Sequence, residues 1–454
     1  MELAAIILAA GKGTRMKSAL PKVLHQIAGR SMVGHVLDTL AGLSPSRIAV
    51  VIGLGMDVVA QAVEPVPAVV QPEQLGTADA VKAAREVLAG ATDTVLVLYG
   101  DTPFISAATL EKMVAARRAT PDTGVVVLGF RPPDPGAYGR LVLGPDGELE
   151  AIVEAREASP EQLSIDLCNS GVMAIDAARI WSLIDAVGND NAKGEYYLTD
   201  IVGLARGQGL ACAYIEADAE ELSGINSRAE LAVAEAIMQR NLRAAAMANG
   251  ATLVDPTTVW FSHDTTIGQD VIIGPSVFMG PGVSVADGAE IRAFCHLEGT
   301  SLGEGVTIGP FARLRPGTVV AKGARVGNFV EIKNAMLEMG AKVNHLTYVG
   351  DAQVGAGANV GAGVITCNYD GFLKHRTEIG AGAFIGSNTA LVAPVKIGEG
   401  AIVGAGSTIT KDVETDALVV ERSETKTVPG AARSYREKKA AEKAATNKKS
   451  RSAD

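Results

Sequence analysis

A glycine-rich turn followed by two basic residues lies close to the start of the chain. The apolar run Leu3–Ala10 predicts a buried strand, and it leads into Gly11-Lys12-Gly13-Thr14-Arg15, with Lys22 further on. Backbone N–H groups of such a turn can bind phosphate oxygens, and cationic side chains can neutralise them. The pattern is neither the dinucleotide fingerprint, because Met16 stands where the third glycine would be, nor a Walker A loop. These residues therefore predict a site for a phosphorylated ligand.

A carboxylate follows the most apolar segment of the N-terminal half. Tyr99-Gly100-Asp101 comes directly after Val95–Leu98. Ligands of parallel sheets bind beyond the carboxyl ends of the strands, and a carboxylate there can bind Mg²⁺ together with phosphate oxygens and water. Asp101 could instead cap the next segment. The sequence thus offers one candidate metal ligand in this half of the chain.

Basic and aromatic side chains recur in the C-terminal half, at positions set by a six-residue repeat. Arg315 and Lys333 lie three repeats apart, and His345 and Tyr348 follow. If three repeats close one coil, Arg315 lies nearly above Lys333, and a phosphate between them would offset their repulsion. His345 could accept a proton near neutral pH, or it could be a structural histidine. The cluster predicts a second anion site.

The repeat that sets these positions is a ladder of aliphatic residues. From Ile267 an aliphatic side chain recurs six residues apart, with restarts one residue early at Leu302, Leu337 and Val354 and a break between Val360 and Ile379. A period of six fits neither an α-helix nor a single strand, but it is typical of parallel β-helices, in which each hexad is a short strand and a turn. An insertion that projects from such a column is where repeat proteins usually bind ligands. The ladder predicts a β-helix that either carries a site or serves only as a trimerising scaffold.

The N-terminal half alternates apolar runs with helical patterns, which predicts a doubly wound, Rossmann-like α/β domain. Residues 227–250 have helical spacing and end at Asn249-Gly250, so they predict a linker helix between the two domains. We expect the α/β domain at 1–226, the β-helix at 251–425 and a basic tail at 426–454. The predicted strands are Leu3–Ala10, Ile48–Ile52, Val95–Leu98, Val125–Phe130 and Gly171–Ile175, and the predicted helices are Met32–Leu40, Ala78–Leu88 and Ala107–Ala119.

Composition narrows the class of protein. The chain has 454 residues and a net charge of −10, so we expect no nucleic-acid partner. Its 4 cysteines are widely spaced, which favours a reducing compartment over a disulfide framework or a zinc cluster. No apolar run approaches the roughly 18 residues of a membrane span, and the start of the chain lacks a basic leader segment. We expect a cytoplasmic protein without an integral membrane segment.

The glycine turn, read from Leu8 to Met16 and continued by Leu20-Pro21-Lys22, resembles the signature of nucleoside-triphosphate sugar-1-phosphate nucleotidyltransferases. Further segments resemble the N-acetylglucosamine-1-phosphate uridylyltransferases. The resemblance implies that Arg15 and Lys22 act on the triphosphate, that Asp101 and Asn226 hold Mg²⁺, and that a sugar phosphate attacks the α-phosphorus of UTP to release pyrophosphate. The residues it places around UTP or UDP-N-acetylglucosamine are Leu8, Ala9, Ala10, Gly11, Lys22, Gln71, Gly76, Thr77, Tyr99, Gly100, Asp101, Gly139, Glu154, Asn169, Tyr197 and Asn226.

The ladder resembles the left-handed hexapeptide-repeat acyltransferases, and only this resemblance supplies the handedness. With the insertion after Val360, about residues 3–425 resemble the bifunctional uridylyltransferase/acetyltransferases. This implies a homotrimer that transfers acetyl from acetyl-CoA to glucosamine-1-phosphate, with His345 as general base and Glu331 orienting it. The implied glucosamine-1-phosphate ligands are Arg315, Lys333, Tyr348, Asn359 and Lys374, and those for acetyl-CoA are Ala362, Asn368, Tyr369, Ser387, Ala405 and Arg422.

Two other functions remain open from the sequence. One is a nucleotidyltransferase of a single activity, with the β-helix as a trimerising scaffold. The other is a non-catalytic regulator that binds a nucleotide sugar. His345 with Lys333 argues against a mere scaffold, and Asp101 with Lys22 argues against a mere binder, because neither role needs those residues.

Overall fold

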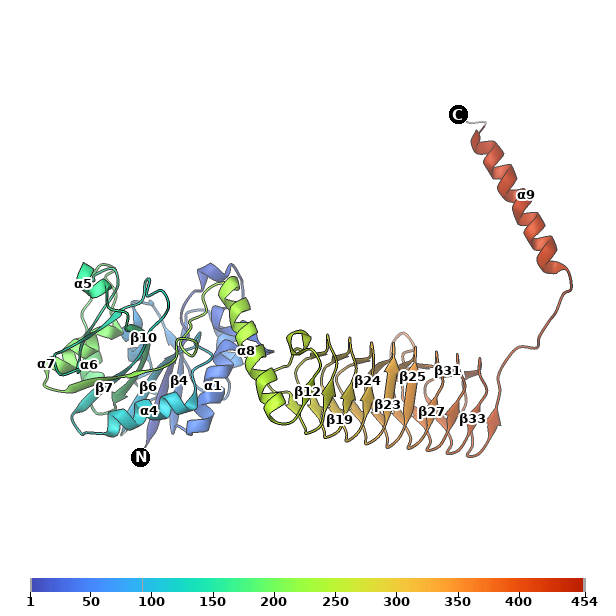
Figure 1. Cartoon of the computed structure of the whole chain (residues 1–454), viewed down its shortest axis with the longest axis horizontal. Coiled ribbons are helices and arrows are strands. Elements are labelled where there is room, and N and C mark those ends of the chain that lie inside the picture. Colours follow the sequence, from blue (N-terminus) through green and yellow to red (C-terminus); the bar gives the residue numbers. More distant parts are fainter. Residues whose placement is uncertain (1, 92, 452–454) are drawn as a thin grey trace. The chain divides into compact units, whose positions relative to one another are not determined.

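The computed structural model describes residues 2–91 and 93–451, which belong to two compact units (Figure 1). One unit consists of Met1–Thr266 with Phe278–Val283, and the other of Ile267–Val277 with Ser284–Asp454. The first is a Rossmann-like α/β domain and the second is a parallel β-helix, so the predicted fold class is confirmed.

A sheet with the strand order β11-β7-β10-β6-β1-β4-β5 forms the centre of the first unit. β1 pairs in parallel with β4 and β6, whereas β10 is antiparallel to β6 and β7, so the sheet is mixed. The strands are β1 (Leu3–Leu8), β4 (Arg47–Gly53), β5 (Ala68–Gln71), β6 (Thr94–Tyr99), β7 (Thr123–Phe130), β10 (Cys168–Asp176) and β11 (Ala211–Glu216), with β8 (Arg140–Leu143) and β9 (Leu149–Val153) at one side.

Helices cover both faces of this sheet. Every side chain of β1 is buried, and alternate residues enter different cores: Ile6 packs on the side of α3, α6 and α7, and Ile7 on the side of α1 and α4. The helices are α1 (Met32–Leu43), α2 (Asp57–Ala62), α3 (Thr77–Ala83), α4 (Ala107–Arg118), α5 (Pro160–Leu163), α6 (Ile180–Ala186), α7 (Ile201–Gly207) and α8 (Arg228–Ala248), with 3₁₀ turns η1 (Thr14–Met16), η2 (Lys22–Leu24) and η3 (Leu198–Asp200).

The long helix α8 begins where the sequence predicts the linker helix. Ser227 accepts a hydrogen bond from the backbone of Glu230, whose side chain in turn accepts one from the backbone of Ser227. This capping box satisfies backbone N–H groups that the first turn leaves unpaired. The helix therefore starts at Arg228, and Glu230 also accepts a hydrogen bond from the backbone N–H of Asn226 at 2.6 Å, which holds that residue in place.

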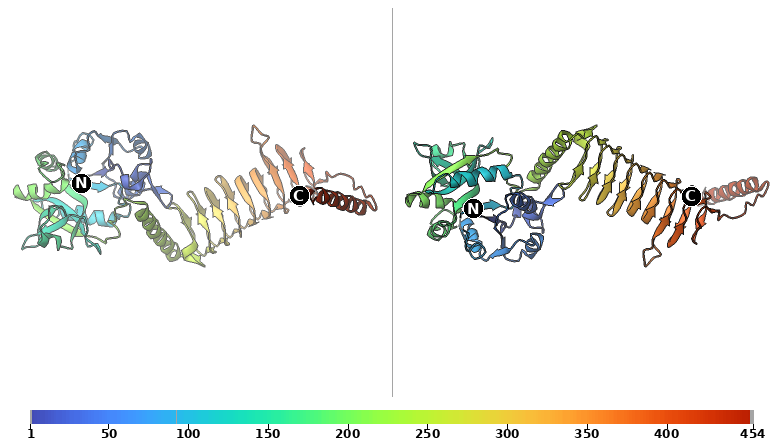
Figure 2. Two further views of the ribbon diagram at one scale, coloured as in Figure 1. Left: turned by 90° about the horizontal axis from the view of Figure 1, so that it is seen from above. Right: turned by 90° about the horizontal axis from the view of Figure 1, so that it is seen from below.

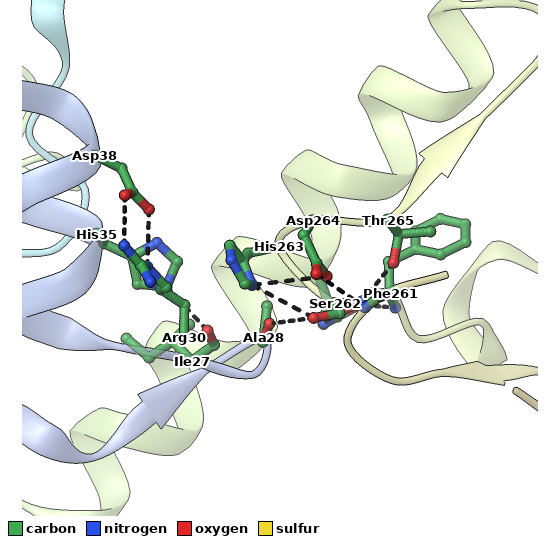
Figure 3. A network of polar contacts seen from close by, with 12 residues as sticks. Ile27, Ala28, Arg30, His35, Asp38, Phe261, Ser262, His263, Asp264 and Thr265 are labelled. Atoms are coloured by element: carbon green, nitrogen blue, oxygen red, sulfur yellow. Dashed lines mark hydrogen bonds and ion pairs between the residues drawn. The ribbon is translucent and has the colours of Figure 1, made fainter. Parts of the chain in front are cut away.

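A short hairpin, β2 (Gln26–Ile27) and β3 (Arg30–Ser31), forms hydrogen bonds both to α8 and to the segment that follows α8 (Figure 3). At the hairpin tip, the backbone N–H of Ala28 donates to Glu235 of α8 at 2.8 Å, and its carbonyl accepts from Ser262 Oγ at 3.0 Å. His35 of α1 is buried and its Nε2 bonds the carbonyl of Ile27 at 2.9 Å. These bonds tie the hairpin into the first unit.

The second unit stacks short strands into three walls, visible as the yellow to orange arrows of Figures 1 and 2. The ladder residues point inward and are buried: Ile308, Val326, Val343 and Val360 pair in sequence along one wall. The strand β12 (Thr252–Leu253) belongs to the first unit. One wall of the second unit contains β14 (Ile272–Ile273), β17 (Glu290–Ile291), β20 (Thr307–Ile308), β23 (Arg325–Asn328), β25 (Lys342–His345), β27 (Asn359–Val360), β30 (Phe384–Ile385), β33 (Ile402–Val403) and β35 (Leu418–Val419).

The remaining strands form the other two walls. They are β16 (Ser284–Val285), β18 (His296–Leu297), β19 (Thr300–Leu302), β21 (Arg313–Leu314), β22 (Thr318–Val320), β24 (Glu331–Leu337), β26 (Tyr348–Val354), β28 (Ile365–Cys367), β29 (Thr377–Ile379), β31 (Ala390–Val392), β32 (Val395–Ile397) and β34 (Thr408–Ile409). The strand β15 (Phe278–Met279) belongs to the first unit, and β13 (Thr266–Ile267) lies where the chain passes from the first unit to the second.

Aromatic side chains stack along one corner of the β-helix. Phe294, Phe311 and Phe329 lie in successive coils with ring centroids 4.9 and 5.1 Å apart, and Leu346 continues the row. All four have positive φ and exposed side chains. This corner row is an apolar stripe on the surface of the unit, which the sequence ladder does not predict because it occupies corners and not strands.

Two further features complete the fold. The predicted insertion forms a hairpin in which Tyr369 pairs with Lys374, seen as the projecting orange loop in Figure 2. The basic tail contains α9 (Ala431–Arg451). Within 2–91 and 93–451, no helix combines the length and the apolar character that crossing a bilayer requires.

Candidate active sites

A cavity of about 340 Å³ lies in the first unit, where β1 and β6 end. Ala9, which directly follows β1, lines this cavity together with Gln71 at the end of β5 and Tyr99 at the end of β6. Sequence reasoning missed Val23, Gln74, Ala80 and Glu195 among its lining residues. The predicted residues that line it are Leu8, Ala9, Ala10, Gly11, Lys22, Gln71, Gly76, Thr77, Tyr99 and Asp101.

Lys22 brings the two predicted metal ligands together. Its ammonium forms an ion pair with the carboxylate of Asp101 and donates a hydrogen bond to Asn226 Oδ1 at 3.0 Å. The two oxygens come from residues far apart in the chain, one after β6 and the other before α8. They converge on one cation, which is the arrangement that a small hard metal ion also requires.

Arg15 does not line the cavity. It is exposed on η1, the turn that follows Gly13, which has φ +58°. A residue that the sequence analysis missed fastens this turn: Arg228 Nε donates to the carbonyl of Met16 at 3.3 Å. The first turn of α8 thus contacts both the glycine-rich turn and, through Asn226, the Lys22 pair.

Hydrogen bonds position three of the predicted sugar residues, Gly139, Asn169 and Glu154. The backbone N–H of Asn169 donates to the carbonyl of Gly139 at 2.8 Å, and Thr199 Oγ1 donates to Glu154 at 3.4 Å. Burial, followed by the charges of Asp101 and Glu154, raises the pKa of Tyr99. Burial is also the main cause that raises the pKa of Glu154. None of Gly100, Gly139, Glu154, Asn169, Tyr197 and Asn226 is part of the cavity lining.

In the second unit, the predicted base and three predicted acetyl-CoA residues lie along one line. His345, Ala362, Ser387 and Ala405 each follow a buried aliphatic residue of successive coils by the same interval, and Asn328 precedes them in the coil before. Because the registers match, these five residues form one row that runs along the wall from coil to coil. The aliphatic residues that pair in register are Val326, Val343, Val360, Ile385 and Val403.

His345 is exposed, and Asn328 holds it. The Nδ1 atom lies 2.8 Å from Asn328 Oδ1. Because an amide oxygen only accepts hydrogen bonds, this contact favours the neutral tautomer with the hydrogen on Nδ1, in which Nε2 keeps the lone pair that a base needs. The role of Glu331 as the orienting group stays a prediction. Within one chain Glu331 pairs with Arg315 at 3.0 Å and lies 3.8 Å from Arg313, because strand register places it beside those residues.

Three cations gather on the adjoining wall. Arg315 and Lys333 lie in register one coil apart, and Lys374 of the insertion approaches Lys333. The Lys374 ammonium, partial burial and the Arg315 charge lower the pKa of Lys333, whereas Asp351 acts in the opposite sense. A phosphate would relieve this repulsion by offering an opposite charge to all three cations.

Asp351 connects this basic cluster with the insertion. Its carboxylate accepts hydrogen bonds from Asn334, at 2.7 Å, and from Asn368, at 2.5 Å. Burial opposes its ionisation, but these bonds and the charges of Lys333 and Lys374 outweigh burial and lower the pKa of Asp351. Asn368, a predicted acetyl-CoA ligand, is thereby fixed beside the cations.

The base and the basic cluster do not share a cavity within one chain. His345 borders a depression of about 460 Å³ with Arg325, Asn328 and Phe329, and none of the predicted sugar-phosphate ligands borders it. His345 is on the wall of β25, whereas Lys333 is on the wall of β24, and the corner row separates the two walls. The remaining predicted ligands are distributed likewise: Asn359 is on the first wall, Tyr348 on the second, and Tyr369 and Arg422 are exposed.

Comparison with known proteins accounts for both units. Residues 5–161 match the MobA-like NTP transferase domain, and residues 299–334 and 376–411 match six repeats of the bacterial transferase hexapeptide. The chain is 61% identical to the bifunctional protein GlmU of Paramagnetospirillum magneticum over 98% of both chains. It belongs to the GlmU family. The GlmU proteins of Rhodospirillum rubrum, 64% identical over 95% of this chain and 97% of theirs, and of Zymomonas mobilis, 51% identical over 96% and 98%, agree.

Membership of the GlmU family settles the class of activity. The chain is a bifunctional transferase, with uridylyltransferase and glucosamine-1-phosphate acetyltransferase activities, and its repeats form a left-handed β-helix. The single-activity and regulator alternatives are thereby set aside. The nucleotidyltransferase match lies in the unit that contains the cavity, and the hexapeptide matches lie in the unit that contains His345.

Proposed function

We propose that the cavity of the first unit binds UTP and N-acetylglucosamine-1-phosphate and makes UDP-N-acetylglucosamine. An oxygen of the sugar phosphate attacks the α-phosphorus of UTP, the bond from that phosphorus to the bridging oxygen breaks, and pyrophosphate leaves. The incoming oxygen is already anionic, so no protein nucleophile is needed. Lys22 and Arg15 neutralise the triphosphate and hold it in line for attack.

The contact of Lys22 with both Asp101 and Asn226 carries this proposal. Two oxygen donors already enclose a cation, so the donor set fits Mg²⁺, which usually takes few protein ligands and completes its shell with phosphate oxygens and water. Asp101 and Asn226 would hold the ion, which would supply charge stabilisation at the reacting phosphates. Release of Lys22 from Asp101 would then leave its ammonium available for the triphosphate.

We propose that the second unit transfers acetyl from acetyl-CoA to glucosamine-1-phosphate. The amine nitrogen attacks the thioester carbonyl, the carbon–sulfur bond breaks, and CoA leaves. His345 Nε2 takes the amine proton, and the cluster of Arg315, Lys333 and Lys374 binds the sugar phosphate. The line through Ala362, Ser387 and Ala405 continues from His345 along the wall, which suits an extended coenzyme whose thioester end lies at the base.

A homotrimer would complete this second site. Within one chain the base and the basic cluster lie on adjoining walls, with the corner row between them. The exposed apolar side chains of that row would be buried if the corner packed against another chain. A neighbour seated there would bring its own wall opposite His345. We place the enzyme in the cytoplasm, where its product would supply glycosyl transfers that build cell-envelope polymers.

Two assays on the full-length chain test the proposal. Pyrophosphate release is measured with UTP and N-acetylglucosamine-1-phosphate, and CoA thiol release with acetyl-CoA and glucosamine-1-phosphate. Both should occur in the wild type and require different substrates. Chelation of Mg²⁺ should stop the first reaction. A sedimentation profile of a monomer with full acetyl transfer would contradict the shared site.

A change in the corner row tests the trimer directly. Phe329→Glu should dissociate the assembly and abolish thiol release, because a carboxylate cannot be buried in an apolar contact without a partner. Pyrophosphate release should persist. Glu304→Gln, an exposed change on the same unit, should alter neither the assembly nor the two reactions.

A further inference from the structure

Gln71 presents its side chain to the cavity in a single orientation. It ends β5, is 3% exposed, and lines the cavity with Gly76 and Thr77. Its Nε2 donates two hydrogen bonds, one to Asp79 Oδ2 at 2.7 Å and one to the carbonyl of Gly76 at 3.0 Å. Both N–H groups of the amide are therefore used within the protein.

The two partners fix which end of the amide faces the ligand. A carboxylate and a carbonyl only accept hydrogen bonds, so the nitrogen of Gln71 must point toward Asp79 and Gly76. Among the described residues, no group donates to Gln71 Oε1. The cavity thus meets a hydrogen-bond acceptor at this position and no donor from this amide.

Neighbouring backbone holds both acceptors firmly. Gly76 has φ +134°, and a Cβ at this position would lie 2.4 Å from the carbonyl oxygen of Tyr196, so only glycine fits. The N–H of Ala78 donates to Tyr196 at 2.9 Å, and the N–H of Tyr196 donates to Leu75 at 2.8 Å. Asp79 lies in the first turn of α3 and also accepts a weaker bond from the N–H of Leu75 at 3.4 Å.

We infer that Asp79 is a positioning residue that sets nucleobase selectivity by locking the amide of Gln71. An acceptor facing the base suits uracil, whose N3 carries a hydrogen, and opposes cytosine, whose N3 is itself an acceptor. Without the lock, the amide of Gln71 could turn over and offer its NH₂ group to cytosine. This inference rests on the proposed binding of UTP in this cavity and adds a role for a residue that does not touch the nucleotide.

The variant Asp79→Asn tests the lock with little change of shape. The asparagine oxygen can still accept from Leu75, but its NH₂ group can also donate to Gln71 Oε1, so the glutamine can take either orientation. Pyrophosphate release is measured with UTP and with CTP. The ratio of kcat/KM for UTP to that for CTP should fall about tenfold or more, because a lost hydrogen-bond match of this kind costs about one to three kcal/mol. Glu86→Gln, an exposed change that removes the same charge beyond α3, should keep the wild-type ratio.

The ratio separates selectivity from folding. Asp79 could only support the first turn of α3, and Asp79→Asn would then reduce the reaction with both nucleotides by the same factor, which would overturn the inference. An unchanged ratio would overturn it as well. Acetyl transfer by the same preparation checks that the rest of the chain is intact.

Competition binding keeps the test independent of turnover. UMP and CMP are titrated against a fluorescent uridine nucleotide, and the affinity ratio should fall in Asp79→Asn by a similar factor. A wild type that released no pyrophosphate from UTP would refute the proposed reaction, and the competition ratio would still decide the role of Asp79. An equal affinity ratio in wild type and variant would reject that role.

Discussion

Lys22 and Asp101 form an ion pair in the cavity of the first unit, with side chains only 14% and 15% exposed, and the same ammonium reaches Asn226. Desolvation offsets much of the attraction in an ion pair this buried, so the pair lowers the free energy of the fold only if its charged groups have further hydrogen-bond partners. Asn226 supplies one such partner. Under the proposed function, Asp101 and Asn226 would hold a metal ion that stabilises charge at the reacting phosphates, and Lys22, released from Asp101, would bind the triphosphate.

Replacing Asp101 should stop nucleotidyl transfer and leave acetyl transfer untouched. Asp101→Ala removes the carboxylate that would hold Mg²⁺ and frees Lys22, so pyrophosphate release should fall about a hundredfold or more. Thiol release, measured on the same preparation, should stay at the wild-type rate. Two exposed changes control for the loss of a surface charge: Asp57→Ala on α2 and Lys112→Ala on α4. Both should keep the wild-type rate of pyrophosphate release. Retained Mg²⁺-dependent pyrophosphate release in Asp101→Ala would show that the metal lies elsewhere.

Replacing the base and its partner should affect acetyl transfer to different degrees. His345→Ala removes the proposed proton acceptor, so kcat for thiol release should fall about a hundredfold or more. Asn328→Ala removes one hydrogen bond that fixes the tautomer, and we expect a loss of about tenfold. His296→Ala, on another wall of the β-helix, should have little effect. If Asn328→Ala matched the wild type while Glu331→Ala lost activity, the orienting role would belong to Glu331 and not to Asn328.

The fold was predictable where periodicity dominates. Inward residues of the β-helix follow the six-residue ladder because each coil repeats the same path, and the register of Leu314 with Ile332 then places Arg315 one coil from Lys333. The direction of β10 was not predictable, because an apolar run such as Gly171–Ile175 reads the same in a parallel or an antiparallel strand.

The site residues that could be predicted from the sequence are those that follow a recognisable strand or belong to a family motif. Asp101 follows an apolar strand and Lys22 follows a glycine turn, so both could be found from the sequence. The contact of Asn328 with His345 depends on which residues turn each corner, and the contact of Asp79 with Gln71 depends on how a helix starts beside a strand. Neither leaves a pattern in the spacing of residue types.

Binding of glucosamine-1-phosphate should draw a proton onto Lys333. Neighbouring cations hold the pKa of Lys333 below its ordinary value, so the free enzyme loses this proton at a lower pH than an isolated lysine would. A bound phosphate favours the charged form and raises the pKa again. Between the lowered and the ordinary value, binding should therefore be accompanied by proton uptake, measured by calorimetry in buffers of different ionisation enthalpy.

Two variants assign that proton. Lys333→Arg keeps a charge that does not titrate, so binding should persist while the linked uptake disappears. Lys333→Ala should raise KM for glucosamine-1-phosphate about tenfold or more, since a charge-assisted hydrogen bond is lost. Lys322→Arg, a matched change on an exposed lysine of the same unit, should keep the uptake. Uptake of wild-type size in Lys333→Arg would assign the proton to another group.

The first unit should lose stability in mild acid through His35. Burial, more than any other cause, lowers the pKa of His35, and the charges of His263 and Arg30 act in the same direction. The bond to Ile27 and the charge of Asp38 oppose the shift without cancelling it. The unfolded chain therefore binds a proton at this position more readily than the folded one, and stability rises with pH in this range.

The pH window follows from that direction. The contribution of His35 is fully present above the ordinary histidine pKa of about 6.5 and is lost as pH falls toward the lowered folded value, by up to about 1.4 kcal/mol per pH unit. Protonation would place a second N–H in the packed network of Figure 3, beside the hairpin that joins α1 to α8. In His35→Gln the amide can still donate to Ile27, but it cannot titrate, so the pH dependence of urea unfolding should flatten. His296→Gln controls for histidine loss elsewhere, and an unchanged slope in His35→Gln would assign the acid sensitivity to a different group.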